Sequence, residues 1–163
     1  MKKLIELLTN KMNNSDEAIA EILTTTWENI PFDLAKNPKK YRRGQLIKTI
    51  RKQIVEDRNK PKKGVYVVYD EDNKKNKFLY IGKTAILSNA IQRHYNDAYN
   101  IGKNVSKNYY DFFRKYKKQL TIYFKKIDNN NDEKKGEALR IIIERLLTVT
   151  ILPQFEIEHP TIK

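Results

Sequence analysis

The sequence predicts an α+β fold in which helices flank a small three-stranded antiparallel sheet. Two runs rich in Val, Ile, Phe and Tyr, at 65–69 and 78–81, enclose the polar segment 70–77 as the strands of a β-hairpin do. A third run, 120–124, alternates with the period of a strand. Apolar residues at helical spacing occupy the other segments, so the order of elements from residue 64 is β, β, α, α, β, α.

Two helices are predicted before the hairpin. The first starts at the cap-like sequence 14–17 and ends before Pro31. The second follows Pro38, and its apolar stripe consists of Leu46, Ile47, Ile50 and Ile54. We therefore expect an N-terminal helical, basic arm over residues 1–63 and one compact domain over residues 64–163.

Three helices are predicted after the hairpin. The first covers residues 85–99, and Ser106 stands where it can cap the second, which carries aromatic residues at helical spacing. The polar loop 128–132 separates the third strand from the last helix. That helix is expected to end near Pro153, because proline cannot continue a helix.

The composition excludes several kinds of site. The chain of 163 residues has no cysteine, which rules out disulfides and cysteine-based zinc sites. Its two histidines, His94 and His159, cannot form a metal cluster by themselves. No apolar stretch approaches the length of a membrane span, so we expect a cytoplasmic protein that binds no membrane.

The net charge of +13 is concentrated just before the hairpin. Residues 36–63 hold twelve Lys and Arg against two acidic residues, whereas residues 1–35 are net negative. A basic cluster of this kind indicates a polyanionic partner such as nucleic acid, and solubility is the alternative explanation. The candidate phosphate-binding residues are Lys39, Lys40, Arg42 and Arg43.

The last helix carries one polar stripe on a largely apolar surface. The stripe consists of Glu137, Arg140, Glu144 and Thr148. One interpretation is a solvent-facing stripe in which Glu144 pairs with Arg140. The other places Glu144 at the edge of a cleft, where its carboxylate could bind a hard cation such as Mg²⁺ with waters completing the shell.

Taken together, the hairpin and the last helix resemble those of the GIY-YIG nucleases. Gly64-Val65-Tyr66 is similar to the first motif of that family, and Tyr80-Ile81-Gly82 matches the second letter for letter. Glu144 precedes Pro153 by nine residues, which is the family's spacing of catalytic glutamate and proline. The resemblance covers residues 64 to 156, and its order of elements is the family's.

Two positions depart from the family pattern. Ungapped alignment places Ala90 where the family has an arginine, and His94 where it has a histidine or tyrosine. Arg93 is the nearest cation and shares a helical face with Ala90, so we favour it as the replacement. Glu156 stands where the family commonly has an asparagine that supports the site.

The resemblance implies a Mg²⁺-dependent DNA endonuclease, with Mn²⁺ able to substitute for Mg²⁺. Tyr66 would be the general base that accepts a proton from the attacking water, assisted by Tyr80. A free tyrosine has a pKa of about 10, so its phenolate needs nearby cations, and Lys83 and Arg93 are the candidates.

The same resemblance assigns the remaining roles. Arg93 would bind the scissile phosphate, His94 would bind phosphate or orient Tyr66, and Glu144 would hold the metal. The products would be a 5′-phosphate and a 3′-hydroxyl. This mechanism requires Tyr66 and Glu144 to reach one shared cavity.

Three roles are compatible with these residues. The small size and the lack of a recognisable second domain favour a restriction-like or phage-encoded endonuclease, whose N-terminal arm extends the DNA-binding surface or forms a homodimer contact. A structure-specific repair or recombination nuclease is the enzyme alternative. Ala90 and Glu156 motivate a third role, a nucleic-acid-binding module whose active site has decayed.

Overall fold

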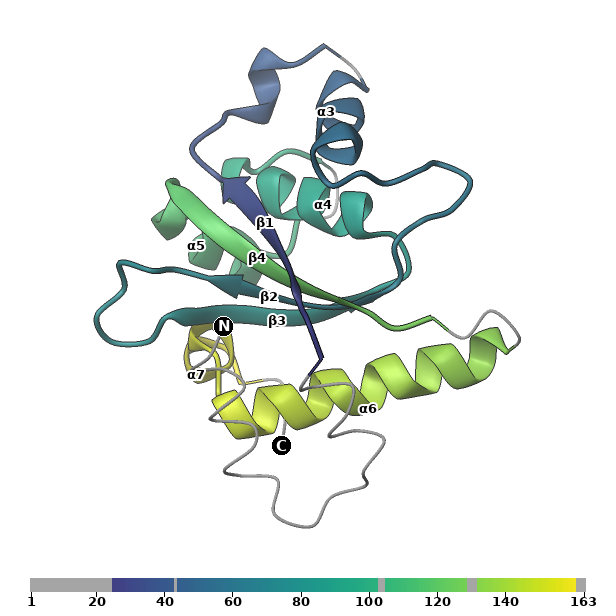
Figure 1. Ribbon diagram of the computed structural model, residues 1–163. Coiled ribbons are helices and arrows are strands. Elements are labelled where there is room, and N and C mark those ends of the chain that lie inside the picture. Colours follow the sequence, from purple (N-terminus) through teal and green to yellow (C-terminus); the bar gives the residue numbers. More distant parts are fainter. Residues whose placement is uncertain (1–24, 43, 103–104, 129–131, 161–163) are drawn as a thin grey trace.

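Four antiparallel strands form the central sheet. The computed structural model describes residues 25–42, 44–102, 105–128 and 132–160. The strands lie in the order β1-β4-β2-β3, and β2 and β3 are the predicted hairpin (Figure 1). Their bounds are Glu28–Asp33 for β1, Gly64–Tyr69 for β2, Phe78–Thr84 for β3 and Gln119–Lys126 for β4.

Helices cover both faces of this sheet (Figure 1). One face packs against α3, α4 and α5, the other packs against α6, and the short helix α7 contacts β3 at the sheet edge. No helix in the described part of the chain is both long enough and apolar enough to cross a membrane. The bounds are Gln45–Gln53 for α3, Leu87–Tyr99 for α4, Lys107–Phe113 for α5, Glu133–Ile151 for α6 and Gln154–Glu158 for α7, with 3₁₀ helices η1 (Pro38–Lys40) and η2 (Arg114–Tyr116).

Alternation along β2 divides the apolar interior into two clusters. Tyr66 and Val68 belong to the cluster that includes residues of α4 and α5, whereas Val65 and Val67 belong to the cluster that includes residues of α6. All four side chains are completely buried. Successive residues of a strand point to opposite faces, so the position of a residue in the hairpin decides which helical layer it meets.

The sheet has one strand more than the sequence predicts. Residues 28–33 pair with β4 as an edge strand, although 28–30 fall at the expected end of the first helix. An edge strand tolerates proline because the missing N–H removes no ladder hydrogen bond, so Pro31 suits this place. Residues 14–24 of the predicted helix lie outside the described residues.

Residues on both sides of position 63 share one sheet and one core. β1 pairs with β4, and Ile30 and Ile50 belong to the same buried cluster as Tyr66. The carboxylate of Glu56 accepts hydrogen bonds from the backbone N–H and the hydroxyl of Ser88, at the start of α4. These contacts attach β1 and α3 to the elements that form the candidate site.

From residue 64 onward the predicted order β, β, α, α, β, α is confirmed, with α7 added at its end. Asp132 caps α6 by accepting a hydrogen bond from the N–H of Lys135 at 3.1 Å. Leu152 then takes a left-handed conformation with φ of 51°, which ends α6, and Pro153 is the N-cap of α7. This sharp turn brings α7 back towards β3.

Gly64→Ala tests the pairing of β2 with β4. A Cβ at position 64 would lie 1.9 Å from the backbone oxygen of Lys125. Because β4 cannot move without breaking its ladder, we expect the free energy of unfolding to fall by about 3 kcal/mol or more in urea denaturation.

Gly44→Ala is the matched control for this test. No atom lies within 4 Å of the added Cβ at position 44, and only the φ of +76° opposes the change. That backbone conformation costs an ordinary residue about 1 kcal/mol. Equal losses of stability in the two variants would contradict the register of β2 and β4.

Candidate active site

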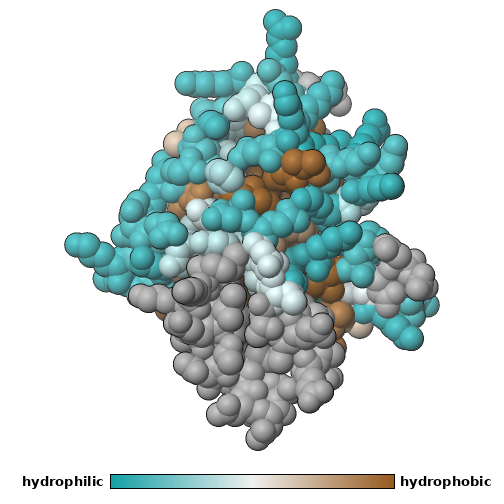
Figure 2. Space-filling view, viewed as in Figure 1, coloured by the Kyte–Doolittle hydropathy of each residue, from teal (hydrophilic) through white to brown (hydrophobic). Residues whose placement is uncertain are grey.

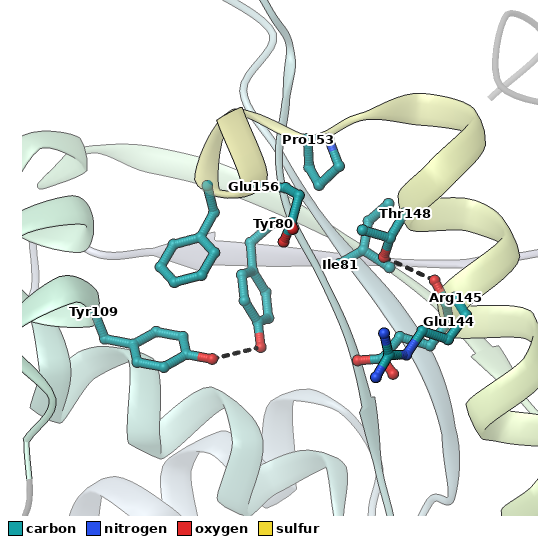
Figure 3. Close-up of a pocket in the computed structure, with 9 residues that line it drawn as sticks. Tyr80, Ile81, Tyr109, Glu144, Arg145, Thr148, Pro153 and Glu156 are labelled. Carbon is teal, nitrogen blue, oxygen red and sulfur yellow. Dashed lines mark hydrogen bonds between the residues drawn. The ribbon is translucent and has the colours of Figure 1, made fainter. Parts of the chain in front are cut away.

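A cavity of about 130 Å³ opens at the β3 edge of the sheet. Its walls come from β3, α5, α6, α7 and Pro153, and in Figure 3 the Tyr80 hydroxyl and the Glu144 carboxylate face one another across it. We call this space the edge cavity. The residues that line it are Tyr80, Ile81, Tyr109, Glu144, Arg145, Thr148, Pro153, Phe155 and Glu156.

Tyr80 presents its hydroxyl to the edge cavity from the middle of β3. The hydroxyl oxygens of Tyr80 and Tyr109 are 3.4 Å apart (Figure 3). The Tyr80 ring meets that of Phe155 edge-on. Burial raises the pKa of Tyr80 well above its usual value, and the neighbouring tyrosines raise it further. Tyr80 is therefore protonated at neutral pH, with its hydroxyl at the cavity wall.

Glu144 supplies a half-buried carboxylate from α6. Burial raises its pKa, while the charges of Lys83 and Arg145 and a hydrogen bond from the Lys83 backbone lower it. The carboxylate is thus held against the backbone of the edge strand, beside two cations. This placement agrees with the cleft-edge interpretation of Glu144.

The alternative pairing of Glu144 with Arg140 is wrong. The Arg140 side chain is buried beneath α6 and donates hydrogen bonds to Glu137 and Glu133 and, at 3.1 Å, to the Ile127 carbonyl. Lys83 pairs with Glu137 in turn. Arg140 and Lys83 therefore form an ion-pair network on the α6 side, which leaves the Glu144 carboxylate turned towards the edge cavity.

Tyr66 forms a buried hydrogen bond on the other face of the sheet. Its hydroxyl lies 2.8 Å from His94 Nε2, and both side chains are completely buried. Burial raises the pKa of Tyr66 above its usual value and lowers that of His94 well below its own, so both groups are neutral at pH 7. The resemblance implied that His94 binds phosphate or orients Tyr66. A hydrogen bond to the Tyr66 hydroxyl suits the second of these roles.

The expectation that Tyr66 itself reaches the same cavity as Glu144 is wrong. Alternation on β2 directs Tyr66 towards α4, and it is not among the residues that line the edge cavity. Tyr80 connects the two places, because it lines the cavity while its ring lies beside that of Tyr66, with the ring centroids 6.0 Å apart. The mechanism in which Tyr66 itself takes the proton of the attacking water at this cavity therefore fails, and the tyrosine that shares the edge cavity with Glu144 is Tyr80.

Arg93 lies next to both tyrosines. Its charge and its hydrogen bond lower the pKa of Tyr66, opposing the effect of burial, and its charge also lowers that of Tyr80. Ala90 is buried in the apolar cluster under α4 and offers no polar group. Arg93, which is exposed on its outer side, is the cation that α4 brings to the tyrosines.

Lys83 does not share the position of Arg93. Residue 83 is on the α6 side of the hairpin, where Lys83 pairs with Glu137 and influences Glu144. The role expected of Lys83 at the Tyr66 phenolate requires the opposite face of β3. The charge of Lys83 lowers the pKa of Glu144 instead.

The basic residues predicted to bind phosphate are exposed near η1 and α3, on the α4 side of the sheet. Lys39, Lys40 and Arg42 are all exposed, while Arg43 lies outside the described residues. Hydrophilic side chains cover most of the coloured surface on the face drawn in Figure 2. These cations are therefore free to meet a polyanion on the same side of the sheet as Arg93.

Three site residues were not predicted to take part in the chemistry. Tyr109, Arg145 and Glu156 all line the edge cavity. Tyr109 is one of the aromatic residues at helical spacing in the second helix predicted after the hairpin, and its ring stacks on that of Phe155 with centroids 4.7 Å apart. Arg145 directly follows Glu144, and this adjacency to a candidate metal ligand was the available signal.

The donor groups of the edge cavity fit Mg²⁺. This ion commonly binds one or two protein carboxylates and keeps several waters. Glu144 and Glu156 supply carboxylates at the cavity, whose volume of about 130 Å³ far exceeds what one water needs. Among the described residues no group of three or more His, Cys, Asp or Glu could hold a metal, so waters and substrate would complete the shell.

Comparison with protein-family models, with curated proteins and with solved structures gives no match to this chain. The geometry of the site therefore carries the functional argument.

Glu144→Gln is expected to stabilise the fold. Because the pKa of Glu144 is raised in the folded state, ionising this carboxyl costs stability as pH rises above the usual glutamate pKa. The variant should exceed wild type by about 0.5 kcal/mol in urea unfolding at pH 7.5, with the difference shrinking at pH 4. A clear loss of stability at pH 7.5 would show that Glu144 serves the fold.

Proposed function

We propose that the chain is a Mg²⁺-dependent DNA endonuclease of the GIY-YIG type, restriction-like or phage-encoded. The observation that supports this most directly is that Tyr80 from the hairpin and Glu144 from α6 line one cavity. Arg93 and the hydrogen-bonded pair Tyr66–His94 lie next to Tyr80. A phenol, a carboxylate and a guanidinium are suitable groups for phosphodiester hydrolysis.

The tyrosines handle the proton of the attacking water. Tyr80 meets the water at the cavity wall, and Tyr66 behind it is hydrogen bonded to a neutral histidine. Because burial opposes a free phenolate at either tyrosine, proton transfer has to be concerted with attack. Arg93 stabilises the negative charge that develops on the phenols and on the phosphoryl oxygens.

Glu144 and the cations beside it handle the phosphate. When bound, Mg²⁺ would neutralise charge on the phosphoryl group and on the leaving oxygen. Glu144 would hold the ion, and Glu156 would offer a second carboxylate at the same cavity. Arg145 also lines this cavity. Lys39, Lys40 and Arg42 would bind phosphates of the DNA backbone at some distance from the cavity. Such phosphate contacts carry no sequence information directly.

Plasmid nicking tests the proposal. Wild-type protein should nick supercoiled DNA with Mg²⁺ and not with EDTA. Tyr66→Phe, Tyr80→Phe and Glu144→Ala should each lower the rate by about 100-fold or more, because each removes a group that acts in the transition state.

Matched controls separate chemistry from folding in this assay. Tyr69→Phe changes a tyrosine of the same strand on the α6 side, and Glu71→Ala removes an exposed carboxylate of the hairpin loop. Both should nick at the wild-type rate. Nicking that survives in Tyr80→Phe and Glu144→Ala would contradict the proposed site.

A salt titration tests the basic segment. Neutralising Lys39, Lys40, Arg42 and Arg43 should reduce the slope of log Kd against log salt by about 0.9 for each lost phosphate contact on duplex DNA. Fluorescence anisotropy with a labelled duplex measures this slope. An unchanged slope would show that these residues are ordinary solvated surface.

A DNA-binding module without catalysis is the second candidate. The observation that favours it is that Ala90, at the position of the family's arginine, is buried in the apolar core, and that Tyr66 does not line the edge cavity. Such a module would bind DNA with the same salt dependence and nick nothing at any Mg²⁺ or Mn²⁺ concentration. If nicking occurs, branched and linear duplexes compared side by side separate a restriction-like enzyme from a structure-specific repair nuclease.

A further inference from the structure

A buried polar chain leads from the edge cavity into the interior beneath α4. Tyr80 lies on the cavity wall, its ring centroid is 6.0 Å from that of Tyr66, and the Tyr66 hydroxyl lies 2.8 Å from His94 Nε2. The other ring nitrogen, His94 Nδ1, lies 3.9 Å from Oδ2 of Asp97, one helical turn further along α4. Tyr66, His94 and Asp97 are all buried.

The two atoms at the inner end of this row of buried polar groups lack hydrogen-bond partners among the described residues. These atoms are His94 Nδ1 and Asp97 Oδ2, and both are inaccessible to solvent. Leaving a buried donor or acceptor unpaired is unfavourable, because neither atom regains the hydrogen bond that it makes to water in the unfolded chain. A protonated Nδ1 is a donor and a carboxylate oxygen is an acceptor, so a small rotation of either side chain would satisfy both.

We propose that Asp97 is a positioning residue that holds His94 with Nδ1 protonated, so that Nε2 accepts the proton of Tyr66. The proposal rests on the proposed function for its catalytic consequence. Neutral imidazole carries one proton, so fixing it on Nδ1 leaves a lone pair on Nε2. Without Asp97, the proton would move to Nε2, and His94 would become a donor to Tyr66.

The negative charge on Asp97 matters once His94 has accepted the proton of Tyr66. Burial raises the pKa of Asp97 to about 6, although the charge of Arg93 opposes this, so the carboxyl is mainly ionised at pH 7.5. When His94 gains the Tyr66 proton it becomes an imidazolium in a buried place. Burial and the charge of Arg93 both lower the pKa of His94 and oppose that imidazolium. The Asp97 carboxylate, 3.9 Å from Nδ1, is the group placed to offset them, as the aspartate of a Ser-His-Asp triad does.

In the proposed transfer, one proton is displaced at each of the two tyrosines between the attacking water and His94. The attacking water gives its proton to Tyr80 as Tyr80 passes its own to Tyr66 and Tyr66 passes its own to His94 Nε2. The hydroxide forms the new bond to phosphorus, the bond to the leaving 3′ oxygen breaks, and that oxygen takes a proton from solvent. His94 then returns its proton through the two tyrosines to solvent.

The protonation of His94 can be measured directly by ¹⁵N NMR at pH 7.5. The chain has two histidines, so a His159→Asn background leaves His94 as the single imidazole. Two-bond ¹H–¹⁵N correlations should show Nδ1 protonated and Nε2 unprotonated. Protonation at Nε2 would overturn the proposal, and the result does not depend on whether the protein cuts DNA.

Variants at position 97 complete the test. Asp97→Ala should move the proton to Nε2 and lower the nicking rate by about 10- to 100-fold. Asp97→Asn keeps an acceptor oxygen without the charge, so it should keep Nδ1 protonated while nicking remains slow. An unchanged His94 spectrum in Asp97→Ala would overturn the proposal, and an inactive wild type with the expected spectra would overturn only the proposed function.

Discussion

The lack of a side chain at Gly82 is the constraint on which the site depends. A Cβ at this position would lie 2.8 Å from the Tyr66 hydroxyl and 2.8 Å from Cε1 of Tyr80. Both distances are shorter than real contacts allow, so any other residue would drive the two tyrosines apart. Since Tyr66 is also fixed by His94 and by core aromatic rings, it has no free direction in which to move.

The edge position of β3 explains how groups from two layers can meet. Alternation sends Tyr80 to the α4 side and Lys83 to the α6 side, and in the interior of a sheet the backbone would separate them. At the free edge, Glu144 reaches the Lys83 backbone while α7 turns back and brings Phe155 onto Tyr109. The edge cavity exists because no further strand of the described chain covers β3.

The local patterns of the sequence predicted most of the fold after residue 63. The hairpin, the third strand and the helix ends rest on short-range preferences for β-branched residues, caps and proline, which act within a few residues. β1 was missed because its strand character comes from pairing with β4, about ninety residues away, and Pro31 is read locally as a helix stop.

The sequence predicted which residues lie at or near the edge cavity better than it predicted how they are arranged. Motif spacing identified Tyr66, Tyr80, His94 and Glu144, and helical geometry favoured Arg93 over Ala90. Spacing carries no information about which face of the sheet a side chain meets once helices pack on both sides. For that reason the positions of Lys83 and of Tyr66 relative to the cavity, and the closeness of Asp97 to His94, emerged only from the three-dimensional structure.

The proposed function depends on one cavity at the β3 edge in which Glu144 would hold a divalent cation beside the Tyr80 hydroxyl. Paramagnetic broadening by Mn²⁺ in ¹⁵N-labelled protein tests it most directly, since Mn²⁺ broadens only signals close to its binding site. The account predicts selective loss of the amide signals of Gly82, Lys83 and Arg145, and recovery of these signals in Glu144→Gln. Broadening centred on the acidic hairpin loop at residues 70–72, or unchanged by Glu144→Gln, would contradict it.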